Sequence, residues 1–144
     1  MEEKRILAVD DDKALLSSLV PILQSEGYLV DTASTGREAI AKIMERAYDL
    51  MLVDIELPDM EGTDLLQRLP IDSADTVKII LTGHPNMDKV VTALFRGADA
   101  YIMKPVSPDE LLKIVEDKLT RRGKLGLMNN KKAANWIETR TQKI

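Results

Sequence analysis

Asp49-Leu50-Met51-Leu52-Val53-Asp54 is the stretch that decides the fold. Four apolar residues in a row, closed by an acid, predict a strand that is buried on both faces and ends in a carboxylate. Strands of that kind belong to parallel sheets, in which helices cover both faces. Ligands of such sheets bind outside the carboxyl ends of the strands. We therefore expect Asp54 at the mouth of a functional crevice.

The composition is typical of one globular domain. The chain has 144 residues, of which 44% are hydrophobic and 31% charged, enough for a sizeable core. It contains no cysteine, which excludes disulfides and thiolate metal sites, and its single histidine, His84, argues against a histidine-rich zinc site. No apolar run has membrane length and no signal-peptide core is present, so we expect a cytoplasmic protein with no membrane partner.

The charge is distributed unevenly along the chain. Residues 1–120 contain 13 basic and 23 acidic residues, whereas residues 121–144 contain seven basic residues and one acid. An acidic body disfavours nucleic-acid binding by this domain. The basic segment is compatible with an anionic partner or with a solvated linker, and the linker is the favoured interpretation.

Strand and helix patterns alternate along the first 120 residues. Short apolar runs near residues 5–9, 28–30, 50–54, 77–82 and 99–104 predict five strands, with helical periodicity or room for a short helix after each. Thr35 and Glu38 match a capping box, and Ser107-Pro108 predicts the start of the last helix. This alternation specifies right-handed crossovers and a parallel sheet covered on both faces.

Apolar spacing predicts which side of each helix faces the sheet. Pro21 falls inside the first of these stripes, where it is expected to kink or restrict the helix. The expected inward residues are Leu15, Leu16, Leu19, Ile22 and Leu23, then Ala39, Ile40, Ile43, Met44 and Ala47, then Met87, Val90, Val91 and Leu94, and finally Leu111, Leu112, Ile114, Val115 and Leu119.

The predicted domain boundary follows Arg122. Gly123 and Gly126 interrupt the helical pattern there, so we assign residues 1–122 to the domain and residues 123–144 to a basic tail or linker. The tail holds one small apolar patch around Trp136. This patch is compatible with a linker, a short docking helix or a homodimer contact.

Polar side chains collect at the predicted strand ends. Because the carboxyl ends of parallel strands meet at one edge, these side chains should face one crevice. Three carboxylates together repel one another unless a hard cation such as Mg²⁺ lies among them. A carboxylate nucleophile, a metal, an amine and a hydroxyl are what phosphoryl transfer to a carboxylate requires. The residues concerned are Asp10, Asp11, Asp54, Thr82 and Lys104.

Each of these residues also has a structural explanation. Asp12 is expected to cap the first helix, and an acid such as Asp54 or a hydroxyl such as Thr82 often ends a strand as a turn or cap residue. Lys104 alone would be a solvated charge. Taken singly, the structural explanation is favoured for each residue. Taken together, several coincidences at consecutive strand ends are the less economical account.

The sequence resembles the receiver domain of the two-component response-regulator family. The resemblance covers about residues 4–120 and implies an α/β flavodoxin-like fold, a doubly wound five-stranded parallel sheet in the order 2-1-3-4-5 flanked by five helices. The matching motifs are Ile6-Leu7-Ala8-Val9-Asp10-Asp11, Leu50-Met51-Leu52-Val53-Asp54, Leu57-Pro58-Asp59-Met60-Glu61-Gly62, Leu81-Thr82-Gly83-His84 and Tyr101-Ile102-Met103-Lys104-Pro105.

The resemblance implies that Asp54 accepts a phosphoryl group from a phosphohistidine. The donor would be a sensor histidine kinase or a phosphotransfer protein. Asp11 would bind Mg²⁺ directly and Asp10 mostly through water, with Asp54 and the backbone carbonyl of Glu56 as further ligands. His84 and the Glu56 side chain occupy positions that tune the lifetime of the phosphoryl group in this family, and the direction of their effect stays open.

The resemblance also implies roles for the ends of the last two strands. Thr82 would hydrogen-bond a phosphoryl oxygen and Lys104 would pair with it. Tyr101 matches the aromatic residue that, in this family, swings inward when the threonine moves towards the phosphoryl group. The competing interpretation is a half-buried packing residue whose hydroxyl faces solvent. The peptide bond between Lys104 and Pro105 is expected to be cis.

Three classes of function remain in competition. The favoured one is a signalling module, not an enzyme, that acts on a downstream protein or on an output domain absent from this chain, since a DNA-binding module needs about 60 residues or more. Phosphatases of the haloacid-dehalogenase type use similar residues, but their nucleophile opens a D-x-D motif on the first strand, and an inserted cap domain is missing here. A binding-only receiver is disfavoured because all five functional positions are filled.

Overall fold

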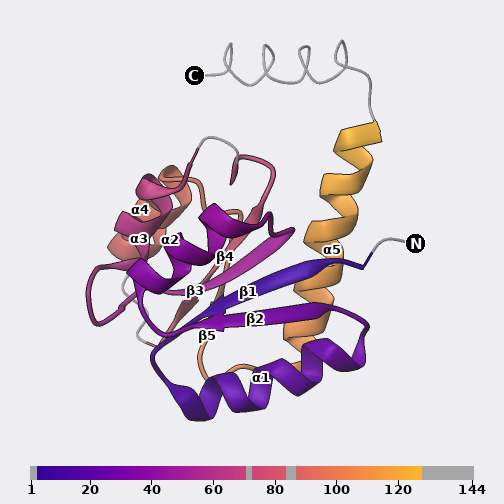
Figure 1. Cartoon of the computed structure of the whole chain (residues 1–144), viewed down its shortest axis with the longest axis horizontal. Helices are drawn as coiled ribbons and strands as arrows, with labels where there is room; N and C mark the ends of the chain where they lie inside the picture. The colour runs from indigo at the N-terminus through magenta and orange to yellow at the C-terminus, as the bar shows by residue number, and fades with distance from the viewer. Residues whose placement is uncertain (1–2, 71–72, 84–86, 128–144) are drawn as a thin grey trace.

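A computed structural model describes residues 3–70, 73–83 and 87–127. In these residues five parallel strands form one sheet in the order β2-β1-β3-β4-β5 (Figure 1). This confirms the expected flavodoxin-like topology. The strands are β1 (Arg5–Val9), β2 (Leu29–Ala33), β3 (Leu50–Asp54), β4 (Val77–Thr82) and β5 (Ala100–Met103).

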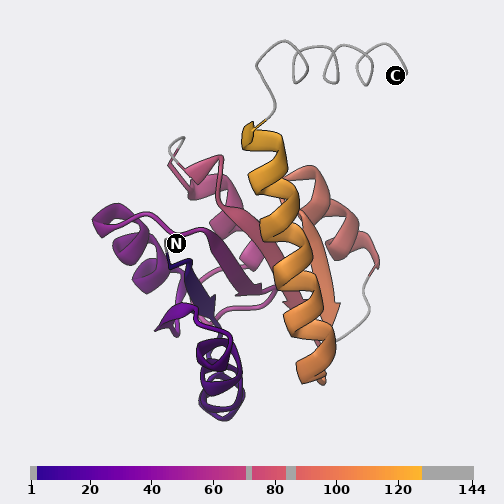
Figure 2. The same cartoon turned by 90° about the vertical axis from the view of Figure 1, so that its right-hand side faces the viewer.

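A helix follows each strand in the described part of the chain. The helices are α1 (Lys13–Ser25), α2 (Gly36–Glu45), α3 (Gly62–Arg68), α4 (Met87–Phe95) and α5 (Pro108–Leu127). Figures 1 and 2 show α1 and α5 on one face of the sheet and α2, α3 and α4 on the other. The sheet is therefore covered on both faces.

Strand β3 lies between the two resulting cores, and all five of its residues are buried. Leu50 and Leu52 pack in the core beneath α1 and α5, whereas Met51 and Val53 pack in the core beneath α2, α3 and α4. Successive side chains of a strand point to opposite faces, so a strand with two dry faces needs an unbroken apolar run. Each fully buried aliphatic side chain contributes roughly 1.5–3 kcal/mol.

The helix boundaries follow the expected signals with one change. The Asp12 carboxylate accepts a hydrogen bond from the backbone N–H of Leu15 at 3.1 Å, which confirms it as the cap of α1. The Thr35 hydroxyl accepts from the N–H of Glu38 at 3.1 Å, as a capping box requires. The Glu38 carboxylate, however, accepts from the N–H of Ser34 at 3.0 Å, one residue before the cap. Helix α1 continues through Pro21 to Ser25.

Several residues expected to face the sheet are exposed instead. In α2, Met44 is 70% exposed and Ala47 lies beyond the helix on the surface, whereas Ala39 is buried. In α4 the structure buries Val90 and Ala93 but leaves Met87, Val91 and Leu94 exposed. The expectation for these exposed residues was therefore wrong. Both helices lie near an edge of the sheet, where a helix finds apolar neighbours along only a narrow stripe.

Helix α5 extends to Leu127, so Gly123 and Gly126 do not interrupt it. A glycine costs a helix interior about 1 kcal/mol relative to alanine, which tertiary anchoring can offset. Leu119 packs in the core, and three residues later the guanidinium of Arg122 donates to the backbone oxygen of Asp49 at 2.7 Å. The domain boundary after residue 122 stays a prediction. The patch around Trp136 lies outside the described residues.

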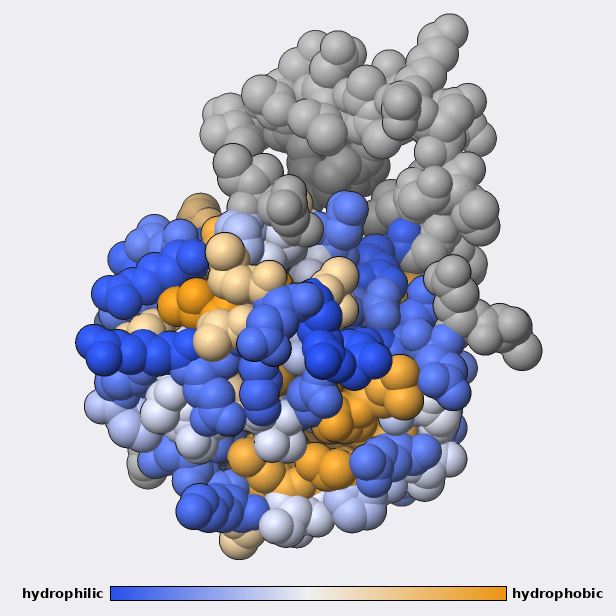
Figure 3. Space-filling model, in the orientation of Figure 1, coloured by the Kyte–Doolittle hydropathy of each residue, from blue (hydrophilic) through white to orange (hydrophobic). Residues whose placement is uncertain are grey.

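The surface of the described residues is largely hydrophilic on the face that Figure 3 shows, with apolar patches of limited extent near α1 and β2. Within the same residues, no helix has both the length and the hydropathy needed to cross a membrane.

Candidate functional site

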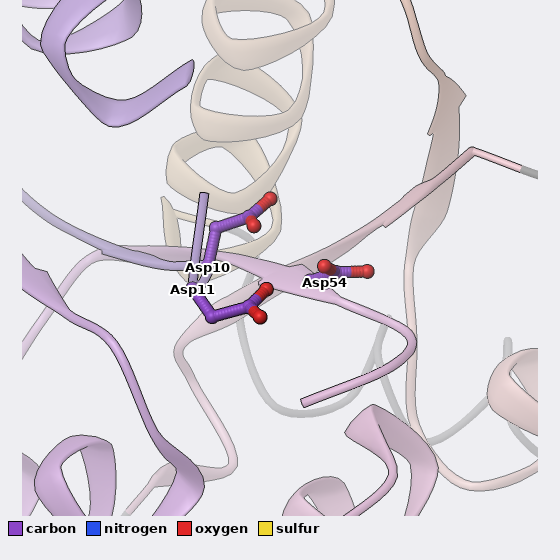
Figure 4. A group of neighbouring side chains, drawn as sticks. All are labelled: Asp10, Asp11 and Asp54. Carbon is purple, nitrogen blue, oxygen red and sulfur yellow. The ribbon is translucent and has the colours of Figure 1, made fainter. Parts of the chain in front are cut away.

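Three carboxylates converge at the carboxyl edge of the sheet. Asp10 and Asp11 follow β1, and Asp54 ends β3. One oxygen of each carboxylate lies within 4.8 Å of those of the other two. In Figure 4 the carboxylates of Asp11 and Asp54 project into the same space. Asp10 is fully buried and Asp54 is buried, whereas Asp11 is exposed, so the group extends from the core to the surface.

Asp10 is the most buried member and is fixed through its backbone and one oxygen. Its N–H donates to the carbonyl of Ala33 at 3.0 Å, and its Oδ1 accepts from the N–H of Asp12 at 2.9 Å. Its Oδ2 lies 2.8 Å from the Nζ of Lys104, which is its ion-pair partner. This buried oxygen therefore has a charge partner but retains lone pairs that a cation can use.

Asp54 is held at both oxygens. Its Oδ1 accepts from the N–H of Glu56 at 3.1 Å, and its Oδ2 accepts from Lys104 Nζ at 3.2 Å. Burial, together with the negative charge of Asp10, raises the pKa of Asp54 despite these two donors. A carboxylate with a raised pKa is more basic, and hence a better nucleophile, than an ordinary one once it is ionised.

Lys104 supplies the ammonium that compensates this group. Burial alone would lower its pKa, but its pairs with Asp10 and Asp54 outweigh burial, so the pKa of Lys104 is raised and the amine stays protonated. Its backbone N–H donates to the carbonyl of Thr82 at 2.8 Å, and its peptide bond with Pro105 is cis, as expected. One ammonium thus faces three carboxylates, which leaves an excess of negative charge.

The carboxylates open into a cavity of about 460 Å³. Thr82 is buried in the wall of this cavity at the end of β4. Five of the expected site residues therefore line or adjoin one cavity. They are Asp11, Asp54, Glu56, Thr82 and Lys104, with Asp10 joined to them through Lys104.

The loop from β3 to α3 forms one side of the cavity. Glu56 and Glu61 form an antiparallel bridge, and the N–H of Gly62 donates to the carbonyl of Ile55 at 2.7 Å. A Cβ at Gly62 would collide with the backbone oxygen of Asp54. Only glycine allows α3 to begin this close to the end of β3, so Gly62 determines the shape of the loop that carries Glu56.

Tyr101 does not line this cavity. It lies on edge strand β5 and is 41% exposed. His84 lies outside the described residues.

The sequence analysis missed one neighbour of the site, Lys89, and the structural role of Asp59. Lys89, in the first turn of α4, contacts Glu56 and Glu61 with its ammonium and lines the cavity. Asp59 accepts hydrogen bonds from the N–H groups of Gly36 and Arg37 at 2.8 and 3.0 Å, and so caps α2 from the β3–α3 loop. The one available signal for Lys89 was its place at the start of a helix that begins at this edge.

The sequence of this chain is similar to sequences of known proteins. Residues 6–116 match the family model described as the response regulator receiver domain. The chain belongs to this family. It is 39% identical over 118 residues to the DNA-binding response regulator MtrA of Mycolicibacterium paratuberculosis, a match that covers 82% of this chain and 52% of MtrA. It is 38% identical over 110 residues to the cell cycle transcriptional regulator CtrA of Caulobacter vibrioides, covering 75% and 47%.

Solved receiver domains have the same architecture. A CheY-like response regulator receiver domain protein from Methanospirillum hungatei is similar with a TM-score of 0.82 and 47% identity, covering 85% of this chain and 98% of that one. The beryllofluoride-activated NtrC4 receiver domain dimer is similar with a TM-score of 0.78 and 36% identity, covering 82% and 98%. The chain spans about half the length of the curated relatives it matches.

As a receiver domain, the chain is a module of phosphorylation-activated two-component signalling. Receiver domains are signalling domains, which agrees with the expected class. The comparisons give no support to a phosphatase of the haloacid-dehalogenase type.

Proposed function

We propose that Asp54 is the phosphoacceptor of this receiver domain and takes its phosphoryl group from a phosphohistidine of a sensor histidine kinase or phosphotransfer protein. The observation that carries the proposal is a buried Asp54 of raised pKa that opens into a cavity beside Lys104 and the acid pair Asp10 and Asp11. The phosphorylated domain then acts on a downstream protein or on an output domain outside this chain. It turns over no substrate beyond losing its own phosphoryl group.

The chain's own residues account for the transfer. A carboxylate oxygen of Asp54 attacks phosphorus, a P–O bond forms, and the P–N bond of the donor breaks with its electron pair left on the imidazole nitrogen. Lys104 already lies 3.2 Å from Asp54 Oδ2, so its ammonium pairs with a phosphoryl oxygen without a large movement. The Thr82 hydroxyl, in the same wall, donates to another oxygen.

The donor set fits Mg²⁺. Three carboxylates gather within 4.8 Å, and one ammonium, which lies 2.8 Å from the buried Oδ2 of Asp10, compensates them only in part. Mg²⁺ prefers such oxygen ligands and keeps several waters. Asp10, Asp11, Asp54 and the backbone carbonyl of Glu56 would hold it. When bound, the ion neutralises charge on the transferring phosphoryl group.

Tyr101 is proposed as the switch that reports phosphorylation. It pairs in register with Ile80 on β4, two residues before Thr82, and its ring is partly exposed. Movement of Thr82 toward a phosphoryl group would free space into which the ring turns. We expect Tyr101→Ala to retain phosphorylation and to weaken the response of a partner. Loss of phosphorylation in this variant would count against a switch role.

Labelling with acetyl phosphate and Mg²⁺ tests the acceptor. We expect the wild-type chain to gain one phosphoryl adduct by intact-protein mass spectrometry and Asp54→Asn to gain none. The matched control is Asp59→Asn, on the same loop, whose side chain faces α2 instead of the cavity and whose labelling should persist. Labelling of Asp54→Asn at the wild-type level would overturn the assignment. A wild-type chain that binds Mg²⁺ but never labels would favour the binding-only receiver.

A further inference from the structure

Lys89 joins two elements across the cavity mouth. It lies in the first turn of α4, and its Nζ is 3.2 Å from Oε1 of Glu56 and 3.3 Å from Oε1 of Glu61. The two glutamates oppose each other in the bridge that closes the β3–α3 loop. Like charges placed opposite one another repel, so this loop geometry depends on a cation between them.

Glu56 connects this ion pair to the phosphoacceptor. Its N–H donates to Asp54 Oδ1, so its backbone is fixed at the acceptor while its carboxylate reaches Lys89. The N–H of Leu57 donates to the carbonyl of Met60 at 3.1 Å and keeps the loop closed behind it. Lys89 is therefore linked to Asp54 only through Glu56, which accepts from Lys89 with its carboxylate and donates to Asp54 with its N–H. Lys89 does not act on the reacting oxygen itself.

The local charge determines what Lys89 does. Glu56 lines the cavity with a side chain that is 61% exposed, and Glu61, with a side chain that is 49% exposed, shares Lys89 with it. The cavity region already holds more carboxylates than ammonium groups. The Lys89 ammonium lies within ion-pair distance of both carboxylates and is the cation that compensates them. Without this charge, two further uncompensated carboxylates would face any anion that enters.

We propose that Lys89 is a positioning residue that compensates part of the negative charge of Glu56 and Glu61 and so admits an anionic phosphodonor to Asp54. The proposal rests on the proposed function of Asp54. It assigns Lys89 to the rate at which the domain is phosphorylated. Lys104, by contrast, contacts the acceptor directly.

The test compares labelling rates of the full chain with acetyl phosphate and saturating Mg²⁺ at low ionic strength. We expect Lys89→Met to label roughly threefold more slowly than wild type, the size expected for the loss of exposed charge pairs. The difference should shrink at high salt because screening removes it. Lys89→Arg should label near the wild-type rate. Lys113→Met, an equal charge change on the exposed side of α5, should have no effect.

A rescue separates charge from structure. Adding Glu61→Gln to Lys89→Met returns the summed charge of positions 56, 61 and 89 to the wild-type value and leaves Glu56 in place, so it should restore the rate. Equal rates for wild type and Lys89→Met would overturn this inference alone. A slow rate that neither salt nor Glu61→Gln corrects would also overturn it. A wild-type chain that fails to label at Asp54 would overturn the proposed function and this inference together.

Discussion

Acids lie both at the amino edge of the sheet, where the strands begin, and at the carboxyl edge, where they end. The two edges differ in how these acids are paired. At the amino edge, Asp49 accepts from the N–H of Arg5 at 2.8 Å and pairs with Arg122 at 2.9 Å. Asp31, in the middle of edge strand β2, is paired in the same way: it accepts from the hydroxyl of Tyr48 at 2.7 Å and pairs with Arg5, at the start of β1, at 3.3 Å. At the carboxyl edge, Asp10 and Asp54 share the ammonium of Lys104 at the core of the site.

The pKa values move in opposite directions at the two edges. Burial would raise the pKa of Asp31 and of Asp49, but their hydrogen bonds and arginine partners outweigh burial and lower it. Burial raises the pKa of Asp54, and its partners do not reverse this. The amino edge therefore stabilises the fold with its charges. The carboxyl edge retains a charge excess that a cation and a phosphoryl group can use, and this costs stability when they are absent.

The largest expected effect is at the amino edge. Arg122→Met removes the donor to both the backbone oxygen and the carboxylate of Asp49, and these groups are then left partly buried without it. We expect a loss of about 2 kcal/mol in the free energy of unfolding, measured with urea. Arg121→Met is the control, because the Arg121 side chain is 70% exposed and pairs along α5 with Asp117; its effect should stay below about 0.5 kcal/mol. Equal effects for the two variants would remove the contrast between the edges.

Asp59 sharpens the comparison, because it is an acid of the carboxyl side with a structural role. Asp59→Ala removes the acceptor of the Gly36 and Arg37 N–H groups while the Thr35 cap remains, and we expect a loss of about 1 kcal/mol in stability. Asp59→Asn keeps an acceptor oxygen and should cost less. A thermal or urea unfolding series with both variants measures this. If Asp59→Ala is as stable as wild type, the loop does not hold α2 in solution.

The smallest expected effect is on how the free energy of unfolding falls at acidic pH. The pKa of Asp49 is lower in the folded chain than in the unfolded one, so its contribution is complete above the unfolded value and is lost as the pH falls through the folded value. Asp49→Asn should therefore lose less stability on acidification than wild type does. Urea unfolding from neutral pH down to strongly acidic pH measures the two slopes. Parallel slopes would show that Asp49 is not ionically stabilised.

The sequence was sufficient for the fold because the signals were local. The apolar run ending at Asp54, the caps at Asp12 and Thr35, and the order of the motifs each specify an element without reference to distant residues. The convergence at the site followed from one rule, that parallel strands share a carboxyl edge. Exposure in α2 and α4 was not predictable in this way, because Met44 and Val91 have the correct spacing but too few neighbours near an edge of the sheet.

Long-range ion pairs were beyond sequence reasoning altogether. Arg122 and Asp49 are 73 positions apart, and Lys89 and Glu56 are 33 apart. Neither pair belongs to a motif, and charged residues are common on any helix surface. The extent of α5 was missed for the same reason. Arg122, which bonds to the distant Asp49, lies next to Gly123, where the helical pattern alone indicated an end.

The stability of Asp54→Asn with and without Mg²⁺ tests the account most directly. Without Mg²⁺, the substitution removes a carboxylate from the undercompensated group, so the variant should be more stable than wild type by roughly 1 kcal/mol in urea unfolding. With Mg²⁺ at about 100 times its dissociation constant, wild type should gain about 2.7 kcal/mol, the variant less, and the order should reverse. A variant less stable than wild type without Mg²⁺, or a gap that Mg²⁺ leaves unchanged, would contradict the claim that this edge is reserved for a cation and a phosphoryl group.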